Sequence, residues 1–222
     1  MLATLAALSL VLPNFTSSHP GPVYTPAQLG FVAVASLVLY GTFVLVQTVR
    51  HRHYFLPPDT ASEDDHAVAP TTREVWTAFG ILIAALIGVV LLAKGLSSHL
   101  EKAVLGAGLP LAVVGVVIAA LVLAPESLAA VKAARRNHLQ TSLNLALGSA
   151  LATIGLTIPS VAILSIVMGW PLTLGLDPKS ITLLILSFIV SILSLGTGRT
   201  TILQGVVHLV IFTAYLFVTI VP

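Results

Sequence analysis

The sequence predicts an all-α fold, a polytopic transmembrane helical bundle, from its composition and from the grouping of its apolar residues. Of its 222 residues, 57% are hydrophobic and 8% are charged, against about a quarter charged in an ordinary soluble domain. The apolar residues gather into runs of about 20, the length that crosses the hydrocarbon core of a bilayer. A soluble domain of this size cannot hide so much apolar surface. Composition therefore excludes soluble enzymes and DNA-binding modules, and it makes the lipid bilayer the expected partner.

The first element is a short apolar segment, residues 1–12, which ends at Pro13. It is about half as long as a span, so we expect it to be part of a helix. A signal peptide is the alternative. That alternative lacks the usual basic start, because the first Lys or Arg in the chain is Arg50.

Six longer runs follow, and each is predicted to form a membrane-spanning helix. Charged residues, Gly or Pro bound each run. The runs cover residues 26–49, 74–96, 104–131, 139–168, 180–195 and 201–221.

A polar segment, residues 50–73, separates the first long run from the other five. It is basic at its start and then acidic, and its prolines interrupt any helix. We therefore expect residues 1–49 to end one membrane unit, 50–73 to form an acidic linker, and 74–222 to form a second unit of five helices. The acidic residues are either a solvated loop or a weak collector of divalent cations, which prefer carboxylate oxygens.

The positive charges predict how the chain is oriented, because loops rich in Lys and Arg stay in the cytoplasm. One side of the membrane receives Arg50, Arg52, Arg73, Lys132, Arg135, Arg136 and Arg199, and the other receives Lys94, Lys102 and Lys179. The linker and the turn at 132–138 should therefore be cytoplasmic, with the C-terminus outside. Since these charges lie in short loops, they report topology and imply no nucleic-acid partner.

Glu126 is the candidate ion-binding residue, because an acidic side chain inside an apolar span is costly and marks a functional site. It directly follows Pro125, which has no N–H and so frees a backbone carbonyl of the preceding turn. A carboxylate beside free carbonyls can bind a cation. The alternative is that Glu126 only ends its helix near the cytoplasmic interface, neutralised by Lys132 or Arg135.

The following run supplies hydroxyl groups at a matching depth. Ser149 follows the basic turn by about as many residues as Glu126 precedes it, so at about 1.5 Å per residue the two should lie at similar depth. Ser149, Thr153 and Thr157 are spaced four residues apart and therefore share one helix face. Hydroxyl oxygens on that face can complete the coordination shell of a cation.

Two other interpretations of this run stay open. Gly148, Ser149, Ala152 and Gly155 are also the small residues that let membrane helices pack closely. Asn144 either hydrogen-bonds across helices or lines the ion pathway.

These segments resemble a known family. The stretch LAPESLAAVKAARRN at 123–137, followed by LNLALGSALATIGLTIP at 143–159, is similar to the second alpha-repeat of bacterial calcium/proton antiporters in the calcium/cation antiporter superfamily. The similarity continues through LGTGRTTILQGVVHL at 195–209 to the C-terminus, so it covers most of the chain.

The resemblance implies a secondary antiporter of a bacterial inner membrane that exchanges Ca2+, Na+ or K+ for H+. In that family the acidic residue of the repeat binds the transported cation and the proton alternately, a role that falls on Glu126. The Gly-Ser of the facing helix corresponds to Gly148 and Ser149. Thr153 stands where related exchangers often have Asn. The site then needs no cofactor, because the cation is cargo.

The resemblance also implies a second repeat that residues 1–49 do not supply. Such exchangers are built from two inverted five-helix repeats, each giving one acidic motif to a shared site. The chain therefore resembles a C-terminal half, preceded by one or two helices of the first half. An N-terminal half is the expected partner. A homo-oligomer is the alternative, although the charge bias predicts one orientation and inverted repeats need two.

His208 lies inside the last run, with Gln204 one turn earlier. It is either a buried histidine held by hydrogen bonds or a proton relay along the ion pathway. A competing function, an intramembrane hydrolase, would use Ser149 as nucleophile and His208 as base. No Gly-x-Ser-x-Gly elbow is present, and that function leaves Glu126 unexplained. A half-transporter that is inactive alone is the nearer alternative.

Overall fold

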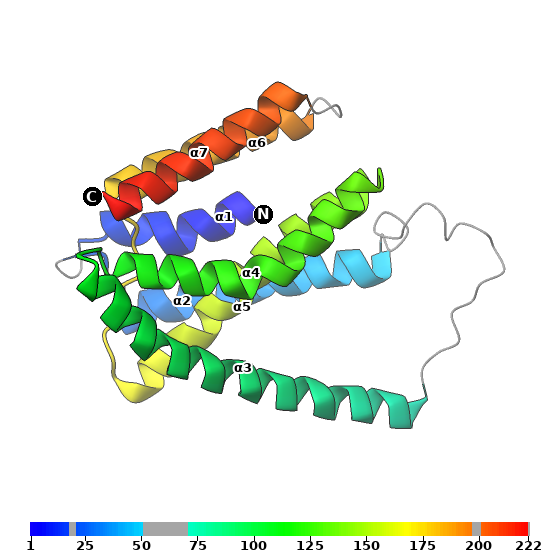
Figure 1. The fold of residues 1–222 in the computed structure, drawn as a ribbon. Helices are drawn as coiled ribbons and strands as arrows, with labels where there is room; N and C mark the ends of the chain where they lie inside the picture. Colours follow the sequence, from blue (N-terminus) through cyan, green and yellow to red (C-terminus); the bar gives the residue numbers. More distant parts are fainter. Residues whose placement is uncertain (18–20, 51–70, 197–200, 222) are drawn as a thin grey trace. The chain divides into compact units, whose positions relative to one another are not determined.

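The computed structural model of the chain describes residues 1–17, 21–50, 71–196 and 201–221. Figure 1 shows that its regular elements are helices. Within these ranges the chain forms no strand beyond an isolated antiparallel bridge between Val23 and Thr173. The predicted all-α class is confirmed.

Seven α-helices account for most of the described residues. They are α1 (Leu2–Ala6), α2 (Pro26–Leu45), α3 (Thr72–Gly106), α4 (Ala112–Arg135), α5 (Leu139–Met168), α6 (Pro178–Gly196) and α7 (Ile202–Ile220). α1 continues through a π-helical turn and a 3-10 turn to Phe15, and a π-helical turn, Val46–Arg50, follows α2. Six of the helices, α2 to α7, are long and apolar enough to cross a membrane, as predicted.

The boundary between α3 and α4 differs from the prediction. The run expected to end at residue 96 continues to Gly106, and the run expected to begin at 104 begins at Ala112. Lys94, Glu101 and Lys102 do not interrupt α3, because a helix that has left the hydrocarbon core can continue through charged turns. The helix stops where Gly108 adopts a left-handed conformation (φ +70°), and Pro110 follows.

The described residues fall into two compact units. The first contains α1, α2 and the chain from Ala129 to Val218, and the second contains α3 and α4 as far as Leu128. The sequence-based division at 1–49, 50–73 and 74–222 stays a prediction, because most of the linker lies outside the described residues.

The core of the first unit lies between α2 and α5, which run side by side (Figure 1). The helices are antiparallel, since Tyr40 meets Gly155 while the earlier Leu29 and Ala33 share a buried cluster with the later Ala162. A Cβ atom at Gly155 would lie 3.0 Å from the Cβ of Tyr40. The close approach that small residues permit between membrane helices therefore occurs here.

The turn between α4 and α5 lies where the sequence predicts it. Asn137 adopts a left-handed conformation (φ +65°), which Asn tolerates better than most residues. The N–H of His138 donates to the carbonyl of Ala133, and the N–H of Asn137 donates to that of Ala134. These two bonds form a Schellman motif, which satisfies the last carbonyls of α4 and reverses the chain.

The N-terminal segment is tied to the connection between α5 and α6. The Tyr24 hydroxyl donates to the carbonyl of Leu8 at 2.6 Å, and the N–H of Leu176 donates to the carbonyl of Leu10 at 3.0 Å. Gly175 leaves room for the side chains of Pro22 and Asn14, which a Cβ atom would overlap. These contacts fix the position at which α6 begins.

Asp177 caps the N-terminus of α6. Its carboxylate accepts from the N–H groups of Lys179 and Ser180 at 3.1 and 3.2 Å. A hydrogen bond from the Ser180 hydroxyl, together with these N–H groups, lowers the pKa of the Asp177 carboxyl below its ordinary value.

Removing this cap should destabilise the chain in a pH-dependent way. Because the folded-state pKa is lowered, the stabilisation is present above the ordinary Asp pKa of about 3.9 and is lost as pH falls through the lower folded value. We expect Asp177→Ala to cost about 1 kcal/mol at pH 7 and to approach the parent chain below about pH 4. Thermal unfolding in detergent, with Asp177→Asn as a control that keeps an uncharged cap, measures this. An equal difference at pH 7 and pH 3 would contradict it.

Candidate functional site

Glu126 lies within α4 and does not end it. The helix continues for nine residues beyond Glu126, to Arg135, with Lys132 and Arg135 in its last turn. The interpretation of Glu126 as a helix terminus is therefore wrong. Its side chain is exposed on the surface of the second unit.

Pro125 is inside the same helix, as the sequence indicated. Because proline has no N–H, the carbonyl of Leu121, four residues earlier, loses its helical donor. Leu121 precedes Glu126 by five residues on the same helix. A carbonyl without its helical donor, followed on the same helix by an acidic residue, is the arrangement that the cation-site hypothesis assumes, and binding of a cation there stays a prediction.

α5 has two faces with different surroundings. One face contains the buried residues Leu151, Gly155, Pro159, Ala162 and Ser165, of which Gly155 and Ala162 pack against residues of α2. Thr153 lies two residues from both Leu151 and Gly155, and two residues turn a helix by about 200°. Thr153 and Thr157 are accordingly exposed, and Ser149 is half-buried. We call Ser149, Thr153 and Thr157 the hydroxyl face of α5; its two threonines are exposed, and the buried residues lie on the opposite face.

Two other predicted pathway residues belong to the α2 side of the helix. Asn144 and Gly148 precede Gly155 by eleven and seven residues, spacings that return to nearly the same side of a helix. A Cβ atom at Gly148 would have no neighbour within 4 Å. Asn144 and Gly148 are thus not grouped with the hydroxyl face, and their roles in the pathway stay predictions.

Glu126 belongs to the second unit and the hydroxyl face to the first. Their meeting across the α4–α5 turn therefore stays a prediction. No group of three or more His, Asp or Glu side chains that could hold a metal occurs among the described residues. The acidic residues at 59–65, the other candidate cation ligands, lie outside the described residues.

His208 connects α7 to α6. Its Nε2 atom lies 3.1 Å from the hydroxyl of Ser191, and its Nδ1 atom lies 2.9 Å from the carbonyl oxygen of Gln204. Both ring nitrogens therefore have partners other than Ser149, which argues against a Ser149–His208 catalytic pair. Sequence reasoning did not single out Ser191, although the serines of α6 at 180, 187, 191 and 194 share one helical face and could have signalled it.

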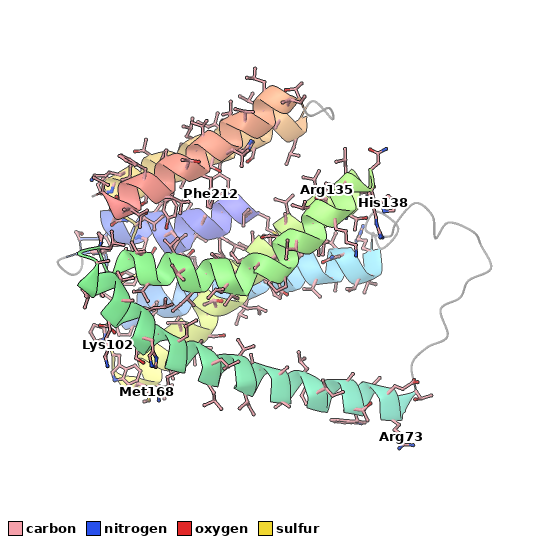
Figure 2. The ribbon with its side chains drawn as sticks, viewed as in Figure 1. Arg73, Lys102, Arg135, His138, Met168 and Phe212 are labelled. Atoms are coloured by element: carbon pink, nitrogen blue, oxygen red, sulfur yellow. The ribbon has the colours of Figure 1, made fainter. Side chains whose placement is uncertain are left out.

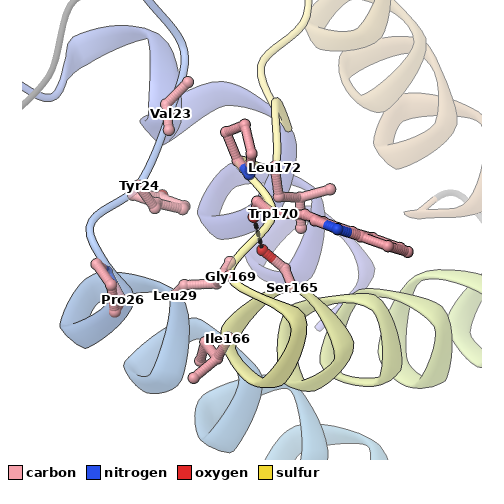
Figure 3. A pocket seen from close by; sticks show the side chains of 10 residues that line it. Val23, Tyr24, Pro26, Leu29, Ser165, Ile166, Gly169, Trp170 and Leu172 are labelled. Carbon is pink, nitrogen blue, oxygen red and sulfur yellow. Dashed lines mark hydrogen bonds between the residues drawn. The ribbon is translucent and has the colours of Figure 1, made fainter.

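A cavity of about 400 Å3 lies between the start of α2 and the end of α5 (Figure 3). It is lined by Tyr24, Leu29 and Trp170, among others, and the Ser165 hydroxyl donates to the carbonyl of Trp170 at 2.6 Å beside it. None of the predicted site residues lines this cavity. It is therefore not the predicted cation site.

Comparison with models of known protein families shows to which family the chain belongs. The family model described as sodium/calcium exchanger protein matches residues 77–221, which include Glu126 and the whole hydroxyl face. The chain belongs to the sodium/calcium exchanger protein family. This membership confirms the resemblance found in the sequence, and it assigns the chain to a family of membrane transporters and not of enzymes.

Three relatives of the chain are named as an ionic transporter or as antiporters. A putative ionic transporter of Sinorhizobium fredii is 51% identical over the whole chain, and the sodium-potassium/proton antiporter ChaA of Escherichia coli is 34% identical over 97% of it. A Ca2+/H+ antiporter of Aphanothece halophytica is 25% identical over 98% of the chain. The chain spans about 60% of the length of these relatives. No solved structure matches it.

Proposed function

We propose that the chain provides one half of the ion-binding site of a secondary antiporter that exchanges Ca2+, or Na+ or K+, for H+. The observation that carries this proposal is the hydroxyl face of α5, on which Thr153 and Thr157 are exposed, on the helix that follows the α4 segment bearing Pro125 and Glu126. The names of the relatives from E. coli and A. halophytica support cation/proton exchange.

Glu126 is the group that binds proton and cation in turn. A cation needs the carboxylate deprotonated, so the proton and the cation compete for the same oxygens. Hydroxyls of Ser149 and Thr153 and the free carbonyl beside Pro125 complete an all-oxygen shell, which suits hard cations. A single carboxylate leaves the choice among Ca2+, Na+ and K+ to the other half of the site.

The proposal includes an orientation. The charge distribution supports an inner-membrane protein with the linker 50–73 in the cytoplasm and the C-terminus outside. A second repeat of inverted orientation would bring the other acidic motif to the same depth, and an N-terminal half supplied by another chain can fill that role.

Proton flux in everted membrane vesicles tests the proposed function. The chain is produced alone and also together with an N-terminal half taken from the E. coli relative. Adding Ca2+, Na+ or K+ should collapse a preset pH gradient when both halves are present. Exchange by the chain alone would show that one half suffices, and silence of both preparations, with the proteins inserted, would overturn antiport.

A further inference from the structure

The α6–α7 hairpin contains a polar seam inside an apolar pair of helices. On α6, Ser180, Ser187, Ser191 and Ser194 face inward, half-buried or buried, while Ile185, Ile189 and Ile192 are exposed. On α7, Gln204 and His208 are half-buried in the same way. Ser180 and Ser194 are fourteen residues apart, so the seam extends about 21 Å along the hairpin.

A cavity of about 290 Å3 lies along this seam. Its polar lining consists of Ser180, Ser187, His208 and Tyr215, and the apolar lining includes Phe212, which Figure 2 labels on α7. Leu176, which precedes α6, also lines it, so the cavity reaches the end of the hairpin. The volume accommodates several water molecules at about 30 Å3 each, and the polar groups supply the partners that bound water requires.

The hydrogen bonds of His208 define how its ring can take up a proton. The Gln204 carbonyl can only accept, so Nδ1–H donates to it and Nε2 is the free base in the neutral ring. The Ser191 hydroxyl then donates to Nε2. When Nε2 binds a proton, the new N–H donates to the Ser191 oxygen, because a hydroxyl can reverse its role. Protonation therefore breaks no bond to the ring.

The described residues of α6 and α7 include few other charged or titratable side chains. α6 has Lys179 as its one titratable side chain and α7 has Tyr215 besides His208, while Asp177 caps the start of α6. Lys179 is twelve residues from Ser191, which is about 18 Å along the helix. Among the described residues of the hairpin, the features next to the His208 ring are therefore its two hydrogen-bond partners and the cavity.

We propose that the α6–α7 hairpin holds a hydrated protonation site, in which His208 binds the proton and the cavity is its water-filled access. The site uses neither Glu126 nor the hydroxyl face of α5. It does not depend on the proposed antiport, and its tests involve no transport.

The first test uses the absence of cysteine from the chain. A single Ser187→Cys substitution is nearly isosteric and places a thiol in the cavity wall. In lipid nanodiscs, a charged, water-soluble maleimide should modify it at least about tenfold faster than Ile189→Cys, because only a thiol in water forms the reactive thiolate. Ile189 lies two residues along the same helix and is 50% exposed. Equal rates, or no reaction at either position, would overturn the hydrated cavity.

The second test follows the ring itself by NMR of the chain labelled with nitrogen-15 histidine. The His208 signals are identified by their loss in His208→Gln. They should change with pH as the ring takes up a proton. Ser187→Leu, which fills the cavity, should remove this pH-dependent change, while Ile189→Leu should leave it as in the parent chain. A His208 ring that does not titrate in the parent chain, or that titrates equally in Ser187→Leu, would overturn the site.

Discussion

Glu126→Gln is expected to abolish cation-driven proton flux in the preparation that shows exchange. Glutamine keeps the size of the side chain but can neither release a proton nor supply a negative charge to a cation. Removing one partner of a desolvated charge pair costs about 2–5 kcal/mol, and each 1.4 kcal/mol or so is a tenfold change in an equilibrium constant. Cation-dependent collapse of a pH gradient in everted vesicles measures the loss, which should exceed about tenfold.

Glu101→Gln is the matched control for this experiment. Glu101 is also exposed, on α3 in the same unit. Its replacement by Gln removes the same charge at a position that has no proline beside it. It should leave the flux unchanged. If the two variants reduce the flux equally, or if Glu126→Gln retains full exchange at the parent level of insertion, Glu126 is not the residue that couples proton and cation.

The sequence predicted the helices well because a membrane imposes a length on each apolar run. The bounds of α5, Leu139–Met168, agree with the prediction at both ends, since the Asn137 turn and Gly169 mark its limits. The error at α3 has a physical reason. This helix has 35 residues, about 50 Å at 1.5 Å per residue, so it extends beyond a hydrocarbon core of about 30 Å. The charged residues from Lys94 onward mark where this helix leaves the membrane. The left-handed conformation of Gly108 marks where the helix itself ends.

The sequence predicted which residues of the candidate site share a helix face, but not how the helices assemble, and the site itself stays a prediction. A spacing of four residues correctly grouped Ser149, Thr153 and Thr157 on one face, because this depends on helix geometry alone. Which face of α5 packs against α2 depends on how side chains of another helix fit, and no periodicity in α5 contains that information. For the same reason the sequence left open whether Gly155 serves packing, which the contact with Tyr40 establishes. The Ser191–His208 bond likewise joins residues of two helices.

Gly155→Leu is expected to destabilise the first unit strongly. A Cβ atom there already lies 3.0 to 3.2 Å from three atoms of Tyr40, so a leucine side chain would force α2 and α5 apart. Overpacking of this kind costs about 1–3 kcal/mol, and loss of close backbone approach removes much of the attraction between membrane helices, which lipid does not replace. Thermal unfolding in detergent should show a clearly lower melting temperature.

Gly148→Leu separates this packing effect from the general effect of replacing a helical glycine. Gly148 lies on the same side of α5, two turns earlier, and has no atom within 4 Å of a built Cβ. Leucine there should gain about 1 kcal/mol of helix propensity or leave the melting temperature unchanged. If both substitutions lower the melting temperature equally, Gly155 does not carry the α2–α5 contact. The hydroxyl face would then no longer be identified as the face of α5 that packing leaves open.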